Sequence, residues 1–377
     1  MNSSSVESPA LQRLEQHLKL DPANPNLLAD AIDLSLALGK PDIARKHADS
    51  ALALRRDDPF VAYRHGNVLI AEGKLDEAAA VFEALSARMA DPSVAHNLAF
   101  VYFRQGRHQQ ARSVLEPLVA SSEVTPLVVT LYLRVLHHLR EIKQAVEMAQ
   151  RHAARCAADA DFLAVASLLC FDGDQPQLAQ RYSDAALASG RRLLEAVVVA
   201  GSLALARDDG PAAARLFGEA LSIAPADGRS WSGLGMASLL QGDLDAAADQ
   251  LERAVFHMPG HIGSWHALGW CRILRRELAL ARECFEKTLA LDRNFGESHG
   301  GLAVVNALDG RVAEAQDEVK LALRLDPQGL SAKYAQMVMS GDAADPERFK
   351  RLALRILATR TGPLGTSLKE SVARRAR

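Results

Sequence analysis

Four histidines, His108, His137, His138 and His152, lie close enough in the sequence to suggest a metal site, because neutral imidazole is a common metal ligand. His137 and His138 are adjacent. Adjacent side chains on a helix point about 100° apart, so this pair does not chelate one ion as a pair four residues apart does. We therefore expect no metal site here.

The glycines Gly233 and Gly235 form the first half of a nucleotide-binding fingerprint. No strand pattern precedes them and no third glycine completes the phosphate-cradling loop, so such a loop is excluded. The sequence shows no nucleophile elbow, no Ser/His/Asp order and no paired-carboxylate cleft, and its connecting segments are too short to hold one. We expect no catalytic residues and no cofactor, and hence no enzyme.

The four cysteines, Cys156, Cys170, Cys271 and Cys284, show no C-x-x-C spacing and have apolar neighbours. This pattern favours reduced thiols in a core over a disulfide framework or a zinc site.

The charge of the chain is balanced overall but uneven along it. The net charge is -2, which argues against binding to nucleic acid or to a membrane by charge alone. From Glu347 to Arg377, nine Lys/Arg stand against two Glu. Met1 to Pro9 has neither the basic nor the apolar run of a signal peptide, and no apolar stretch is long enough to span a bilayer. We expect a cytoplasmic protein without stable membrane insertion.

One alanine recurs along most of the chain at intervals of 34 residues, with a single step of 33. It is found at Ala44, Ala78, Ala111, Ala145, Ala179, Ala213, Ala247, Ala281 and Ala315. A glycine often stands five residues earlier, as at Gly242, and a proline often stands twelve residues later, as at Pro259. Such a fixed period is the signature of a repeat architecture.

The repeat unit has the pattern of a helical hairpin. The residues before Gly242 are apolar with helical period, and glycine at that point is suited to end a helix in the left-handed conformation. Asp243 to His257 is again amphipathic with helical period, and Pro259 then ends the second helix. The recurring alanine, together with first-helix glycines such as Gly235, indicates that two helices approach closely there.

These residues resemble the tetratricopeptide repeat, a 34-residue helix-turn-helix unit. The resemblance is carried by Trp231, Leu234, Gly235, Ala247, Leu251, Ala254 and Pro259. It implies an all-α, right-handed superhelical solenoid of about nine tandem repeats with terminal half or degenerate repeats. We place the repeats at 25–58, 59–91, 92–125, 126–159, 160–193, 194–227, 228–261, 262–295 and 296–329.

The ends of the chain depart from the repeat. Residues 1–24 are expected to be a disordered N-terminus followed by a leading half-repeat. Residues 330–361 resemble a degenerate capping repeat with a docking stripe at Phe349, Leu352, Ala353 and Ile356. Residues 362–377 are expected to form a basic flexible tail, or alternatively a tether to an acidic partner or anionic lipid.

The match is weakest between residues 126 and 193. Arg140 and Asp174 replace the turn glycine, Ser167 replaces the first-helix glycine, and His152 replaces a small residue. A bent or looser joint in this segment is the alternative to a regular array.

In tetratricopeptide repeat proteins the first helices line a concave groove, and the resemblance places a set of side chains there. The first zone contains Phe60, Tyr63, Asn67, His96, Phe100, Phe103, Arg104, Arg134, His137 and His138, and the second contains Arg229, Met236, His266 and Trp270. The first mixes aromatic and polar groups suited to a polar or acidic peptide, and the second is mostly apolar. The alternative is that these residues pack against neighbouring repeats.

Two ligand classes known in the family fit this sequence poorly. Asn67 and Arg134 occupy positions of the family's carboxylate clamp, but Tyr63, Phe100 and Thr130 stand where it has Lys, Asn and Lys. Of the asparagine ladder found in sugar-transferring members, only Asn97 is present.

The resemblance therefore implies a non-enzymatic scaffold or adaptor that binds a protein or peptide segment in its groove, and no nucleic acid. The alternative is a regulatory or targeting subunit of a separate enzyme, such as a glycosyltransferase or sulfotransferase, or of a bacterial secretion or envelope-assembly machine. Self-association through an end repeat is a further possibility. The Ala-, Leu- and Arg-rich composition suggests a bacterial source.

Overall fold

The computed structural model describes residues 8–344 of the chain. All regular structure in this range is helical, which confirms the all-α prediction. The chain divides into two compact units at Cys156/Ala157, inside the segment 126–193 that matches the repeat least well. The predicted docking stripe from Phe349 to Ile356 and the basic segment 362–377 lie outside the described residues.

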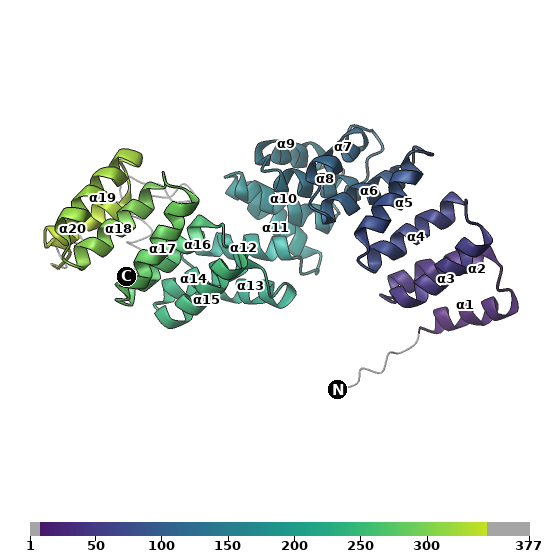
Figure 1. The fold of residues 1–377 in the computed structure, drawn as a ribbon, viewed down its shortest axis with the longest axis horizontal. Coiled ribbons are helices and arrows are strands. Elements are labelled where there is room, and N and C mark those ends of the chain that lie inside the picture. Colours follow the sequence, from purple (N-terminus) through teal and green to yellow (C-terminus); the bar gives the residue numbers. More distant parts are fainter. Residues whose placement is uncertain (1–7, 345–377) are drawn as a thin grey trace. The chain divides into compact units, whose positions relative to one another are not determined.

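Unit 1 contains a leading helix and four helical hairpins (Figure 1). Its helices are α1 (Pro9–Leu20), α2 (Pro25–Ala37), α3 (Pro41–Leu54), α4 (Pro59–Ala71), α5 (Leu75–Ser86), α6 (Pro92–Arg104), α7 (His108–Val119), α8 (Pro126–His138) and α9 (Ile142–His152).

Unit 2, within its described residues, contains five hairpins followed by one helix and a 3-10 turn. Its elements are α10 (Ala160–Asp172), α11 (Pro176–Ala188), α12 (Leu194–Ala206), α13 (Gly210–Ile223), α14 (Gly228–Gln241), α15 (Leu244–His257), α16 (Ile262–Leu274), α17 (Leu278–Leu291), α18 (Gly296–Leu308), α19 (Val312–Leu325), α20 (Leu330–Met339) and η1 (Asp342–Ala344).

The turn inside each hairpin has the same geometry with or without glycine. Five turns place a glycine at positive φ, such as Gly242 at 80°, and four place Arg140, Asp174, Asp208 or Arg276 at φ values of 56 to 64°. In every hairpin the next N–H donates to a carbonyl five residues back, as Glu141 does to Leu136 at 2.9 Å. This Schellman bond ends the first helix. The weaker sequence match at Arg140 and Asp174 therefore does not change the turn.

The small residues lie where the two helices of a hairpin meet, as predicted. All nine recurring alanines, from Ala44 to Ala315, are fully buried. A Cβ added to Gly235 would lie 2.6 Å from Cγ of Leu251, and one added to Gly269 would lie 2.8 Å from the ring of Phe285. Close packing at these positions explains why larger side chains are not found there.

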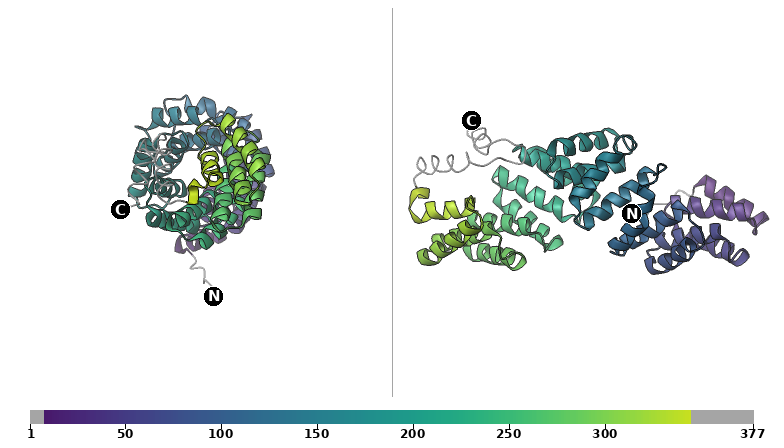
Figure 2. Two further views of the ribbon diagram at one scale, coloured as in Figure 1. Left: turned by 90° about the vertical axis from the view of Figure 1, so that its left-hand side faces the viewer. Right: turned by 90° about the horizontal axis from the view of Figure 1, so that it is seen from above.

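Successive hairpins stack within each unit (Figure 2). The second helix of one hairpin packs on the first helix of the next, as α5 does on α6 and α15 on α16. Apolar cores form around Ile32 and Val68 in unit 1 and around Phe217, Leu251 and Phe285 in unit 2. This arrangement of stacked hairpins is a helical solenoid, as predicted.

All four cysteines are buried. Burial raises the pKa of Cys170 to about 12 and that of Cys284 to about 11, which keeps both thiols protonated and poorly nucleophilic. None of the helices between residues 8 and 344 is long and apolar enough to cross a membrane.

Candidate functional site

The first helices of unit 1 bring three polar side chains of the predicted set into one network. Asn97 on α6 donates through Nδ2 to the hydroxyl of Tyr63 at 3.1 Å and to Oδ1 of Asn67 at 2.7 Å, both on α4. Its own Oδ1 contacts Nδ1 of His96 at 3.1 Å. In this network the hydroxyl oxygen of Tyr63 and Oδ1 of Asn67 accept hydrogen bonds. Neither the Tyr63 hydroxyl hydrogen nor the Asn67 amide hydrogens are donated to another described residue.

A hollow of about 310 Å³ opens beside this network, between α6 and α8. Tyr63, His96 and Asn97 form its polar side, and Val124, Leu127 and Val128 belong to its apolar side. Its size matches the lower end of the range for small ligand pockets, which is enough to accommodate one or two side chains of a longer ligand.

Large apolar side chains stand in solvent at the start of α4 and α8. Phe60 is 71% exposed and Leu127 is 63% exposed. Each directly follows a proline, Pro59 or Pro126, in the first turn of its helix. Proline is tolerated there because its missing N–H would have no partner within the helix. The side chain of Asp58 caps α4 by accepting from Phe60 N at 2.9 Å. Phe60 and Leu127 therefore occupy the same position in two repeats, at the start of the first helix.

The other end of α6 and α8 carries aromatic and basic groups. The guanidinium of Arg104 lies 5.8 Å from the ring centroid of Phe100. Phe103 packs edge-on against His138, whose ring stacks on His108 at 4.6 Å. Arg134 and His137 lie half-buried on α8. Arg104 is exposed beside the half-buried ring of Phe100, whereas Phe103 and His138 contact each other within unit 1.

No acidic group is among the neighbours that shift the pKa of His138. Burial, followed by the charges of His108, His137 and Arg140, lowers the pKa of His138. The rings of His108 and His138 face each other rather than pointing at one common point. Within residues 8–344, no group of three or more His, Cys, Asp or Glu has the geometry for a metal ion.

The second zone, on α14 and α16 of unit 2, uses its side chains internally. Arg229 forms two hydrogen bonds with Asp172 on α10, at 2.8 and 3.1 Å. Trp270 donates to Nε2 of His266 at 3.1 Å and its ring lies 5.8 Å from that of Tyr334 on α20. Met236 remains 37% exposed. This region favours the alternative in which the predicted residues pack against neighbouring repeats.

The ring of His266 is enclosed by aromatic neighbours. Phe285 and Phe295 lie 5.5 and 5.6 Å away, both edge-on. Burial lowers the pKa of His266 despite the opposing charge of Glu297. A neutral imidazole therefore accepts the Trp270 hydrogen bond, and this pair stabilises the packing of α16.

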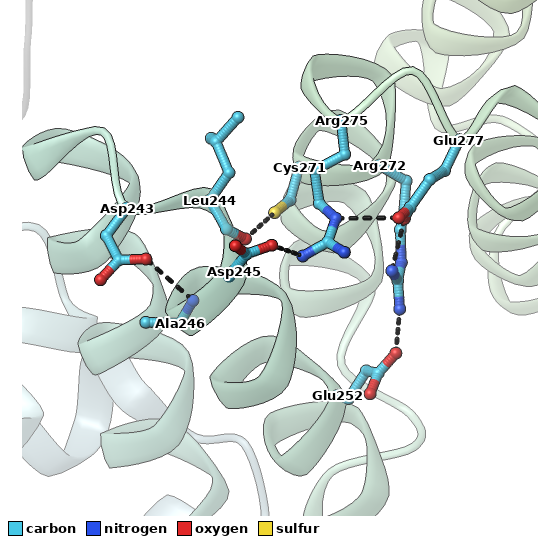
Figure 3. Close-up of polar contacts among 9 residues, drawn as sticks. All are labelled: Asp243, Leu244, Asp245, Ala246, Glu252, Cys271, Arg272, Arg275 and Glu277. Carbon is cyan, nitrogen blue, oxygen red and sulfur yellow. Dashed lines mark hydrogen bonds and ion pairs between the residues drawn. The ribbon is translucent and has the colours of Figure 1, made fainter.

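Two features of the molecule were not predicted from the sequence. Leu127 stands at the repeat position of Phe60, and the same register would have found it. The other is an ion-pair network that joins α15 to α16 and the following turn (Figure 3). Arg272 contacts Glu252 and bonds to Glu277 at 2.5 Å, and Arg275 bonds to Glu277 at 2.9 Å. Its members come from three segments, and no spacing rule links them.

Comparison with known families matches the repeats directly. Two models described as "Tetratricopeptide repeat" match the chain, one at residues 69–134 and the other at residues 29–92, 198–260 and 275–329. The chain belongs to the tetratricopeptide repeat family. The unmatched stretch between 134 and 198 overlaps most of the segment of weakest resemblance, 126–193. No curated protein sequence matches the chain.

Solved tetratricopeptide repeat structures resemble this one in fold alone. The human IFIT1 dimer with PPP-AAAA is 15% identical, with a TM-score of 0.53, and the match covers 99% of this chain and 92% of that one. A tetratricopeptide repeat protein from Parabacteroides merdae ATCC 43184 is 16% identical with a TM-score of 0.46, covering 70% of this chain and 99% of that one. At such identities the ligands of these proteins do not transfer.

Proposed function

We propose that this tetratricopeptide repeat protein is a non-enzymatic scaffold that binds an extended segment of another protein along α4, α6 and α8. The observation that carries the proposal is the Tyr63–Asn97–Asn67 network beside an open hollow. The predicted cytoplasmic location and bacterial source fit such a role and stay predictions.

The polar network suits a peptide backbone. A polypeptide offers a carbonyl acceptor at every residue, and Tyr63 and Asn67 have hydrogens to donate to it. Asn97 donates to the oxygen atoms of both side chains. The hydroxyl of Tyr63 and the amide group of Asn67 are therefore oriented before the ligand binds. Such preorganisation lowers the entropic cost of binding.

The apolar groups supply anchoring contacts. Phe60 lies three residues before Tyr63 on α4, Leu127 lines the hollow beside Tyr63, and both stand in solvent. An extended ligand places alternate side chains on one face. We infer that one apolar ligand side chain enters the hollow beside Leu127 and another packs on Phe60. At the far end of α6, Arg104 favours an acidic residue in the ligand.

The test begins with affinity capture from the native cell, with the full chain as bait, followed by mass spectrometry. Segments of the captured protein are then titrated against the parent, Phe60→Ala and Asn67→Ala by fluorescence anisotropy. Leu20→Ala is a matched control, because Leu20 on α1 is 85% exposed and distant in sequence from the network. Loss of binding in Phe60→Ala and Asn67→Ala but not in Leu20→Ala supports the proposal, and equal binding by all four proteins contradicts it.

Two other outcomes separate the competing functions. An enzyme activity that co-purifies with the bait and changes on addition of the pure chain would identify a regulatory subunit. PPP-AAAA, the ligand in the human IFIT1 structure, serves as a second probe. If the parent binds PPP-AAAA in competition with the captured segment, the ligand of this surface is an oligonucleotide and not a polypeptide.

A further inference from the structure

A second hollow lies in unit 2, on helices whose exposed groups play no part in the proposed function. Its volume is about 540 Å³, and its lining comes from α15, α16 and α17. The apolar lining includes Val255, Phe256, Trp265, Leu268 and Leu280. Phe256 is 79% exposed, and in the part of the chain that the structure describes only Leu20 is more exposed among the large hydrophobic residues.

The wall of this hollow is held rigidly. Trp265 donates through Nε1 to the carbonyl of Pro259 at 2.9 Å, which fixes its ring. Arg272 lines the hollow and is held between Glu252 and Glu277 (Figure 3). The site is therefore preformed, as ligand pockets usually are.

Phe256 itself has little support from its own unit. Its ring lies 5.1 Å from the ring of its neighbour His257, and both residues are exposed. An aromatic group so exposed beside an apolar hollow marks an interaction surface. The side chain projects from the rim of the same hollow that would accept a ring of its size.

We propose that this surface binds a second copy of the chain, each copy inserting Phe256 into the hollow of the other. Such a contact is isologous, because one patch carries both the projecting ring and its receptor. Of the charged residues that line the hollow, Arg272 and Glu252 are already paired with each other, which leaves Glu283 and Lys287 on α17. Among the described residues, neither Glu283 nor Lys287 forms an ion pair, and a two-fold axis brings such groups of opposite sign together.

The test is sedimentation velocity on the full chain at concentrations from about 1 μM to about 100 μM, a range that spans moderate affinities. The parent is expected to show a reversible monomer–dimer equilibrium. Phe256→Asp is expected to weaken dimerisation about 30-fold or more, as loss of a central aromatic contact does. Phe60→Asp is the matched control, because Phe60 is 71% exposed on α4 of unit 1, and its dissociation constant should equal that of the parent.

A second pair of variants tests the geometry and guards against misfolding of the first. Lys287→Glu should weaken the dimer, and Lys287→Glu combined with Glu283→Lys should restore it. Circular dichroism should show parental helicity, because both side chains are exposed. A parent that is monomeric throughout the range, or a dimer that Phe256→Asp and Lys287→Glu leave unchanged, overturns the proposal. A dimer lost with Phe60→Asp would move the interface to unit 1.

Discussion

Phe60 on α4 and Trp270 on α16 both belong to the predicted groove, but their surroundings differ. Phe60 is 71% exposed, whereas Trp270 donates to His266 and packs beside Tyr334. The arginines differ likewise. Arg104 stands over Phe100, while Arg229 is paired with Asp172, which lies 57 residues earlier. In unit 1, Phe60 and Arg104 remain exposed, whereas in unit 2 Arg229 and Trp270 contact side chains of other helices.

This difference shows that the position of a residue in its repeat determines where its side chain points but not whether that side chain is available for binding. The register decides which way a side chain points, because every described hairpin has the same turn and packs its two helices against each other. Whether that side chain is available depends on residues of other repeats, such as Asp172 and Tyr334. Packing and binding compete for the same positions, and the neighbours decide between them.

The largest expected effect concerns the packing of unit 2. Phe285→Ala should lower the free energy of unfolding by about 3–5 kcal/mol, because this fully buried ring packs against Gly269 and under His266. Phe60→Ala should change it by less than about 0.5 kcal/mol, as expected for an exposed side chain. Urea unfolding followed by circular dichroism measures both. Similar losses for the two variants would mean that burial does not separate these residues.

Binding should show the opposite order. Phe60→Ala should weaken the complex with the captured segment by about 2 kcal/mol, roughly 30-fold, if its ring is an anchor. Trp270→Ala should leave that affinity unchanged while it destabilises unit 2, because its indole contacts His266 and Tyr334. Anisotropy titrations on variants with parental circular dichroism measure this. If Trp270→Ala weakens binding as much as Phe60→Ala, both first-helix surfaces hold the ligand.

Most of the fold was predictable from the sequence because the same residue types recur at the same positions of successive repeats. The alanines at a step of 34 residues are all buried, and the glycines lie where helices approach. The left-handed turns at Asp208 and Arg276 were not foreseen, because a residue other than glycine adopts this conformation uncommonly. The division at Cys156/Ala157 depends on the sum of many contacts, and sequence resemblance located only the segment that contains it.

The sequence predicted several residues that lie near the hollow, but not the hydrogen bonds that these residues form. Tyr63, Asn67 and His96 do gather near one hollow. Asn97, seen from the sequence only as a fragment of another ladder, proves to be the residue that orients Tyr63 and Asn67. Its role depends on contacts across repeats at separations of 30 and 34 residues. No periodic pattern says which of several polar groups will bond to one another.

A smaller effect distinguishes the arginines of the two units. Arg104→Glu should weaken binding of an acidic segment several-fold at about 0.1 M salt and much less at about 1 M, because exposed charges are screened. Arg229→Gln should leave binding unchanged at both, since its charge is already paired with Asp172. Anisotropy titrations at the two salt concentrations measure both variants. Salt-independent loss in Arg104→Glu would show that the side chain acts through its contact with Phe100 instead.

The smallest expected effect is a dependence of unit 1 on pH. Burial and the positive charges of His108, His137 and Arg140 lower the pKa of His138 below its ordinary value of 6.5. The unfolded chain then binds a proton before the folded chain does, so stability falls as the pH drops through and below 6.5. His138→Phe keeps a ring against Phe103 and His108 but does not titrate, and it should flatten this dependence.

Amide hydrogen exchange on α7 and α8 between pH 7.5 and pH 5 follows the opening of this pair, once rates are corrected for the intrinsic effect of pH. The parent should open more readily at the lower pH, and His138→Phe should change less. Unit 2 provides the internal comparison, because burial also lowers the pKa of His266, and α16 should respond equally in both proteins. A parental pH dependence on α7 and α8 in His138→Phe would assign the effect to another group and leave the histidine stack a packing contact only.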